Sequence, residues 1–142
     1  MCGLCRRGEK GQAPQPPGGQ VKISYSERYD LPAPVVEIKV KSPRGKVVNL
    51  EALIDSGADI TVFPRELLDE LDLLPGSSVL VEGYDGSLEE HYSYFIEIEI
   101  EGVTESMVEA ITGRDMLLGR NFLNKLDVIL KGKEREVEIF DP

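Results

Sequence analysis

The sequence predicts a mostly β fold with one or two short helices in a single compact domain. Apolar and charged residues alternate along residues 36–40 and 95–101, which is the period of a strand with one buried face. Asp85-Gly86 separates two further strand-like segments and is a strong hairpin signal. The length of 142 residues fits one domain with its own core and is too short for two ordinary domains.

The first predicted hairpin leads to the residue of greatest chemical interest. Residues 42–45 read as a turn after the alternation at 36–40, and a second alternation follows along residues 48–54. The outgoing strand therefore delivers Asp55 from a rigid element into a loop.

A short helix is expected next, over residues 65–71. Pro64 suits the first helical position, and Leu67, Leu68 and Leu71 share one face. The acidic side chains of this segment are expected to form a solvated face rather than a metal site; they are Glu66, Asp69 and Glu70.

A long hairpin is expected around Asp85-Gly86, because both positions of a two-residue turn must tolerate positive φ. Its return strand continues into the isoleucine and glutamate alternation at 95–101. Residues 121–125 can start a second helix, and residues 128–130 and 137–140 form a closing hairpin.

The composition limits the possible partners. The formal charge of −10 argues against a nucleic-acid-binding surface, which needs clustered lysine and arginine. No apolar run approaches the roughly 20 residues needed to cross a bilayer, and the N-terminus lacks the apolar core of a signal peptide. We therefore expect a cytoplasmic protein without nucleic-acid or membrane partners.

Residues 1–19 differ from the remainder in composition. They hold five glycines and three prolines, which predicts a disordered tail before a domain at residues 20–142. Cys2 and Cys5 lie in this tail, and a zinc site of four thiolates would need a second such pair. A zinc ion shared between two chains is the alternative to a tail that simply contains two thiols. We expect no metal and no cofactor.

Two motifs carry the chemistry. The triplet Asp55-Ser56-Gly57 alone is also a common turn in which the carboxylate accepts backbone hydrogen bonds. Its context is more specific: an apolar strand precedes it, a hairpin follows, and Gly119 comes 64 residues after Asp55. The second motif reads Leu117-Leu118-Gly119-Arg120-Asn121.

On these motifs the chain resembles the retropepsin-like, or retroviral-type, aspartic peptidases, roughly from residue 35 to 130. The resemblance implies a single-lobe closed β-barrel that is active as a two-fold dimer, with Asp55 as the catalytic carboxylate of each subunit. The chain differs from the family in a flap tip poorer in glycine and in the C-terminal hairpin after Asp127. Viral relatives interleave their chain ends to hold the dimer together.

The resemblance also implies roles for the neighbours of Asp55. Ser56 would hydrogen-bond across the two-fold axis, and Gly57 would let the substrate backbone approach. Ala58 would keep the floor of the cleft small. Asp59 would touch substrate main chain and form an ion pair with Arg120, and a purely structural ion pair is the alternative.

The turn of the long hairpin would act as a flap over bound peptide, with Tyr84, Asp85 and Gly86 in contact with substrate. An ordinary exposed turn is the alternative. His91 is the only histidine, so a Ser-His-Asp or Cys-His mechanism has little support and His91 is expected to be structural.

The expected function is that of a homodimeric aspartic endopeptidase acting on peptide or protein substrates. Peptide hydrolysis without a metal needs one carboxylate to activate water and a protonated one to polarise the carbonyl oxygen. Two adjacent Asp55 carboxylates sharing one proton supply both. The alternative is a non-catalytic dimeric peptide-binding module that retains the fold.

Overall fold

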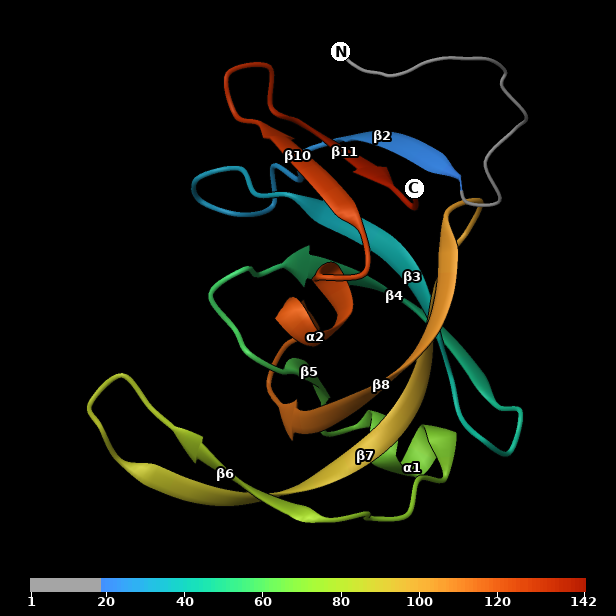
Figure 1. Ribbon diagram of the computed structural model, residues 1–142, viewed down its shortest axis with the longest axis vertical. Coiled ribbons are helices and arrows are strands. Elements are labelled where there is room, and N and C mark those ends of the chain that lie inside the picture. The colour runs from blue at the N-terminus through green and yellow to red at the C-terminus, as the bar shows by residue number, and fades with distance from the viewer. Residues whose placement is uncertain (1–18) are drawn as a thin grey trace.

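The computed structural model describes residues 19–142, which form two sheets and two short helices (Figure 1). The predicted tail lies outside the described residues except for Gly19, as do Cys2 and Cys5, and the tail boundary stays a prediction. The strands are β2 (Gln20–Ser24), β3 (Val35–Lys41), β4 (Val47–Ile54), β5 (Thr61–Pro64), β6 (Ser78–Glu82), β7 (Leu88–Ile100), β8 (Thr104–Gly113), β9 (Leu117–Leu118), β10 (Asp127–Lys131) and β11 (Glu136–Phe140); the helices are α1 (Leu67–Leu71) and α2 (Arg120–Leu123).

The larger sheet closes into a barrel. Its strand order is β3-β4-β9-β5-β8-β7-β6, and β7 also pairs with β3, where Lys39 lies opposite Glu99. The ring therefore consists of β3, β4, β9, β5, β8 and β7, and β6 extends beyond it by pairing with β7 alone. The predicted mostly β, closed-barrel fold is confirmed.

The barrel core follows the predicted alternation. Ile96, Ile98 and Ile100 on β7 are buried, and so are the apolar residues on the inner face of β3. Phe63 from β5 and Tyr94 from β7 pack edge to face with ring centroids 5.6 Å apart. Burial of these side chains from distant strands stabilises the closed ring.

A smaller three-stranded sheet covers one end of the barrel, at the top of Figure 1. Its order is β10-β11-β2, so the first and last described strands pair with each other and β11 lies between two neighbours. Val137 and Ile139 on β11 are buried against the core. The predicted closing hairpin is β10–β11.

The predicted helix start at Pro64 is wrong. Pro64 is the last residue of β5, which pairs in parallel with β8, and Pro64 lies opposite Gly113. Parallel pairing draws residues 61–64 into the barrel wall. The proline costs no bond to Gly113 there, because the Arg65 N–H donates to the Gly113 carbonyl oxygen at 3.1 Å. Helix α1 begins at Leu67, and its buried residues are Leu67 and Leu71, on the predicted face.

The hairpin at Asp85-Gly86 is present, but its turn is not the predicted type. Only Gly86 has positive φ, at 83°, and the Gly86 N–H donates to the Gly83 carbonyl oxygen at 3.0 Å. The Gly83 N–H donates to the Ser87 carbonyl oxygen at 2.8 Å. This is a three-residue loop in which a type I turn precedes a left-handed glycine, so Asp85 needs no positive φ.

Four strands were not predicted from the sequence: β2, β5, β8 and β9. Strands β2, β5 and β9 pair with strands distant in the chain, whereas β8 pairs both with its neighbour β7 and with the distant β5. Within residues 19–142, no helix is long and apolar enough to span a membrane.

Candidate active site

Asp55 lies where β4 leaves the barrel. Strands β4 and β9 run in parallel, with Leu53 opposite Leu117, and the Asp55 N–H donates to the Leu118 carbonyl oxygen at 3.1 Å. The carboxylate accepts a hydrogen bond from the Gly57 N–H at 3.0 Å. This hydrogen bond within the loop fixes the carboxylate. Because Asp55 is only half-buried, its carboxylate still reaches the surface.

Gly57 leaves space beside this carboxylate. A Cβ atom at this position would come within 3.3 Å of Asp55 Oδ1, which is tighter than ordinary van der Waals contact. A larger side chain would crowd the carboxylate and the exposed surface in front of it. Gly57 is itself exposed and so leaves the backbone accessible.

Arg120 ties the second motif to the Asp55 loop. Its guanidinium donates to the Ser56 carbonyl oxygen at 2.7 Å and contacts Asp59 Oδ1, and its N–H donates to the Ala58 carbonyl oxygen at 2.8 Å. The ion pair expected between Asp59 and Arg120 is therefore present, with side chains 84% and 45% exposed. An exposed pair contributes little stability, so its main effect is on the position of the loop.

A buried polar network below the loop was not predicted. The Thr61 hydroxyl donates to Asn121 Oδ1 at 2.9 Å and accepts from the Gly119 N–H at 3.1 Å. Asn121 Oδ1 also accepts from the Thr61 N–H at 3.0 Å, and its amide donates to the Glu109 carbonyl oxygen at 2.6 Å. Thr61 is fully buried. The sequence feature that could have pointed to this network is the single hydroxyl residue Thr61 directly before the apolar pair Val62-Phe63.

The structure does not bring the flap tip to Asp55. Tyr84 is fully exposed, and the hairpin of β6 and β7 projects away from the barrel in Figure 1. The hydrogen bonds of the tip are local: Asp85 Oδ1 accepts from the Ser87 hydroxyl at 2.7 Å and from the Ser87 N–H at 3.0 Å. The hydrogen bond from the Ser87 hydroxyl contributes most to lowering the pKa of Asp85.

His91 lies on β7 beside Glu89, whose carboxylate is 3.2 Å from His91 Nε2. Its only described charged contact is this neighbour on the same strand, which agrees with a structural role. The described part of the chain contains no cluster of three or more possible metal ligands.

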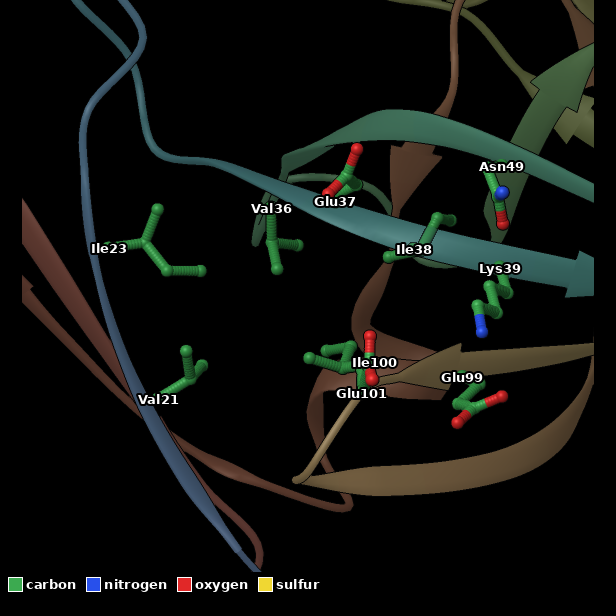
Figure 2. Close-up of a pocket in the computed structure, with 10 residues that line it drawn as sticks. All are labelled: Val21, Ile23, Val36, Glu37, Ile38, Lys39, Asn49, Glu99, Ile100 and Glu101. Carbon is green, nitrogen blue, oxygen red and sulfur yellow. The ribbon is translucent and has the colours of Figure 1, made fainter.

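Two cavities lie elsewhere. One has a volume of about 420 Å³ and separates β2 from β3 and the end of β7, with Val21, Val36 and Ile100 among its apolar lining residues (Figure 2). The other has a volume of about 240 Å³ and lies beside Arg44 and Phe95. Neither cavity contains a residue of the Asp55 loop.

A single β-barrel lobe with one Asp-Ser-Gly carboxylate at its rim, braced by a Gly-Arg-Asn segment, defines the class of single-lobe aspartic peptidase folds. The chain belongs to the family described as gag-polyprotein putative aspartyl protease, which matches residues 45–125, more than half of its length. No curated protein matches the chain in sequence.

Two solved structures support the same fold. The retropepsin-like aspartic protease from Rickettsia conorii is 14% identical, with a TM-score of 0.59, over 85% of this chain and 90% of that one. The EIAV protease complexed with the inhibitor HBY-793 is 20% identical, with a TM-score of 0.50, over 72% of this chain and 92% of that one. The predicted retropepsin-like fold is confirmed.

Proposed function

We propose that the protein is an aspartic endopeptidase whose active site forms between two copies of the chain. The observation that carries this proposal is the placement of Asp55 at the barrel rim. Its carboxylate accepts from the Gly57 N–H, and Arg120 holds the loop through Ser56 and Asp59. The family to which the chain belongs favours the same chemistry.

The reaction needs two carboxylates close together. Two such groups resist simultaneous ionisation, so the pair holds one proton. The ionised Asp55 removes a proton from the attacking water, and the protonated one polarises the substrate carbonyl and then protonates the leaving nitrogen. Each chain supplies one Asp55 in the Asp-Ser-Gly context, so a two-fold axis beside this loop brings the second one.

The residues beside Asp55 contact the substrate or hold the loop in place. Ser56 is exposed, where its hydroxyl can hydrogen-bond across the axis, and Gly57 admits the substrate backbone. Asp59 is mostly exposed although it pairs with Arg120, which leaves its second oxygen free to accept from substrate main chain. Ala58 limits the bulk of the floor.

The substrate is an extended peptide. Such a peptide satisfies its backbone hydrogen bonds on the loop floor and on the flap, in the manner of an added strand. The exposed tip residues Tyr84, Asp85 and Gly86 are free to close over it, since their hydrogen bonds are confined to the turn. Closure of the flap from the open position is part of the proposal.

Replacement of the proposed catalytic carboxylate tests this function. Asp55→Asn keeps the shape of the side chain and removes its general-base and general-acid chemistry, so peptide cleavage should fall at least about a thousandfold. Asp69→Asn, an exposed residue of α1, is the matched control and should cleave normally. Circular dichroism and light scattering should show the wild-type fold and mass for both variants. Unchanged cleavage by Asp55→Asn would exclude Asp55 from the mechanism.

A peptide library, incubated from acidic to neutral pH with and without a hydroxyl transition-state mimic, separates the enzyme from a binding module. Cleaved products support the peptidase, whereas binding without product at every pH supports the module.

The expected cytoplasmic location stays a prediction, which imaging of the tagged full chain would test.

A further inference from the structure

Strands β2 and β3 begin as neighbours and then diverge around an opening. Ser26 and Ala33 exchange two backbone hydrogen bonds, at 2.8 and 3.1 Å, where the two strands meet. The far side of the opening is closed where β3 starts to pair with β7 at Lys39, and where the Gly19 N–H donates to the Val103 carbonyl oxygen at 3.3 Å. The cavity of about 420 Å³ drawn in Figure 2 lies between these contacts. It is therefore bounded by β2, β3 and the end of β7.

The inner edge of β2 has no strand partner in the part of the chain that the structure describes. Residues of an antiparallel strand direct their backbone groups alternately to one side and to the other. The Tyr25 N–H donates to the Arg135 carbonyl oxygen on the β11 side, whereas Ser26 bonds to the segment before β3. Every second residue before Ser26 therefore directs its backbone groups into the opening, and these residues are Ser24 and Lys22.

The facing edge of β3 also lacks a strand partner over its first residues, among the residues described. The Ile54 N–H donates to the Pro34 carbonyl oxygen at 3.0 Å, so the even-numbered residues of this segment bond toward β4. Leu53, which lies opposite Val35, donates away from β3 instead. Val35 and Glu37 therefore direct their backbone groups into the opening. Val35 is only 6% exposed, and backbone groups at such a position are costly to leave unpaired.

The opening has an apolar wall and an acidic rim. On the rim, Glu99 pairs with Lys41, and Lys39 lies opposite Glu99 on the neighbouring strand. Glu37 and Glu101 are exposed and have no ion pair within residues 19–142. A segment that fits this opening combines apolar side chains with positive charge. The apolar lining residues are Val21, Ile23, Val36, Ile38 and Ile100.

The beginning of the sequence combines these two properties. Four of its first five residues are apolar. Arg6, Arg7 and Lys10 follow with only Glu9 to oppose them, so three positive charges against one give a net charge of +2. This stretch therefore matches both the wall and the rim of the opening.

The length of the chain before Gly19 allows this stretch to reach the opening. Gly19 lies at one corner of the opening, through its hydrogen bond to the turn between β7 and β8. The 13 residues 6–18 span at most about 43 Å when extended. The five residues of β2 cover about 17 Å. The chain can thus return from Gly19 along the whole opening.

We propose that residues 1–5 lie in this opening as an extended segment of the same chain. Their backbone bonds to the unpaired groups of Val35 and Glu37, in the manner of strand addition. Cys2 and Leu4 share one face of an extended segment and turn toward the apolar wall. The small sheet is thereby joined to the barrel by a further strand.

The two arginines that follow lie at the rim. Arg6 and Arg7 contact the carboxylates of Glu37 and Glu101, which have no other cation among the described residues. Exposed ion pairs add little stability, so burial of the apolar side chains holds the segment and the arginines fix its direction. Residues 8–18 act as the linker.

Thiol labelling of the full chain tests this placement, because Cys2 and Cys5 are its only cysteines. Alkylation is followed by mass spectrometry under reducing conditions, and each rate is compared with that of a synthetic peptide of residues 1–10. Cys2 should react about tenfold more slowly in the folded chain, because a segment docked about nine-tenths of the time exposes its thiol for the remainder. Leu4→Asp should abolish this protection, since a carboxylate is costly to bury in an apolar wall. Gln12→Asp places the same charge in the linker and should keep the protection.

A charge exchange shows where the segment lies. Arg6→Glu with Arg7→Glu, and Glu37→Lys with Glu101→Lys, each bring like charges together. Each double variant should lose at least about threefold of the protection, measured against a peptide of its own sequence. The chain with all four substitutions should regain it, because the charges are again opposite.

The matched control for the rim reversal is Glu66→Lys with Glu70→Lys, at two exposed acidic residues of the α1 region. It makes the same change in net charge away from the opening and should keep the protection. Loss of protection in this control would show that overall charge, and not the rim, holds the segment, and would overturn the proposed contact.

Amide hydrogen exchange provides a second readout, on the opening itself. The Val35 and Glu37 amides bond to the docked segment, so they should exchange about tenfold faster in Leu4→Asp than in the wild type. The Ile38 amide bonds toward β4 and is the control, which should exchange equally in both proteins.

The outcomes decide the proposal without reference to peptide cleavage. Protection of Cys2 that Leu4→Asp removes and the fourfold substitution restores supports the docked segment. Unprotected Cys2, reversals without restoration, or Val35 and Glu37 amides that do not respond to Leu4→Asp would overturn it. Protection that disappears on dilution would assign the segment to a second copy of the chain and would also overturn it. Neither readout involves Asp55, so its failure leaves the proposed peptidase intact.

Discussion

Thr61 and Asn121 are joined by two hydrogen bonds, from the Thr61 hydroxyl at 2.9 Å and from the Thr61 N–H at 3.0 Å, both to Asn121 Oδ1. These bonds connect the start of β5 to α2 beneath the Asp55 loop. The Gly119 N–H completes the network by donating to the same hydroxyl. The loop that carries the proposed catalytic residue therefore rests on a buried polar support.

Removal of the Thr61 hydroxyl should destabilise the fold. Thr61→Val keeps the shape and leaves the buried Gly119 N–H without its partner, which should lower the free energy of unfolding by about 2 kcal/mol. Thr61→Ser keeps the hydroxyl and loses only a methyl group, so it should cost about 1 kcal/mol. Urea denaturation measures both. A larger loss for Ser than for Val would contradict the importance of the hydroxyl.

Gly119 should tolerate no side chain. A Cβ atom at this position would lie 2.5 Å from the backbone carbon and oxygen of Ile60, so Gly119→Ala should displace the Asp55 loop and cost about 2 kcal/mol or more. Gly132 has nothing within 4 Å of a built Cβ atom, and Gly132→Ala should change stability by less than about 0.5 kcal/mol. Equal thermal midpoints for the two variants would refute the steric argument.

Arg120 should matter more for activity than for stability. Arg120→Ala breaks the exposed pair with Asp59 and the bond to the Ser56 carbonyl oxygen, at a cost of about 1 kcal/mol in stability. The misplaced loop should reduce kcat/KM about a hundredfold. Arg120→Lys keeps the positive charge but loses the planar guanidinium with its several donors, so its activity should also be impaired. Arg114→Ala, at an exposed arginine, is the control. Full activity in Arg120→Ala would show that the loop needs no such brace.

The ion pair of Glu138 and Lys131 should make stability depend on pH. The hydrogen bond from Lys131 holds the pKa of Glu138 below its ordinary value of 4.5. The folded state thus binds this proton more weakly than the unfolded state, so the contribution is complete above pH 4.5 and is lost as the pH falls through the lower pKa. Glu138→Gln should therefore have a lower urea midpoint than the wild type at pH 7, and the difference should shrink at pH 3. A gap that widens in acid would contradict this sign.

Local patterns explain what could be predicted of the fold. The β3–β4 hairpin has alternation on both strands and a turn between them, so its signals lie within one short segment. The same holds for the isoleucines of β7. Strand β5, in contrast, owes its conformation to parallel pairing with β8, and the sequence of Thr61–Pro64 alone fits the entry to a helix equally well. Strand β2 depends on β11 at the other end of the chain.

The candidate site divides in the same way. Asp55 and Gly57 could be predicted because their motif is contiguous, and the ion pair of Asp59 with Arg120 followed from the resemblance of two separated motifs. The support formed by Thr61 and Asn121 could not, because a hydroxyl reveals its partners only when β5 and α2 are placed side by side. The open position of the flap also depends on tertiary structure and has no sequence signal.

The most direct test of the shared active site is to titrate the wild type with Asp55→Asn chains and measure peptide cleavage after subunit exchange. If two Asp55 carboxylates form one site, mixed dimers are inactive. A ninefold excess of the variant should then reduce cleavage per wild-type chain to about one-tenth, because only about one wild-type chain in ten finds a wild-type partner. Cleavage per wild-type chain that stays constant throughout the titration, while mass measurements show mixed dimers, would contradict the account.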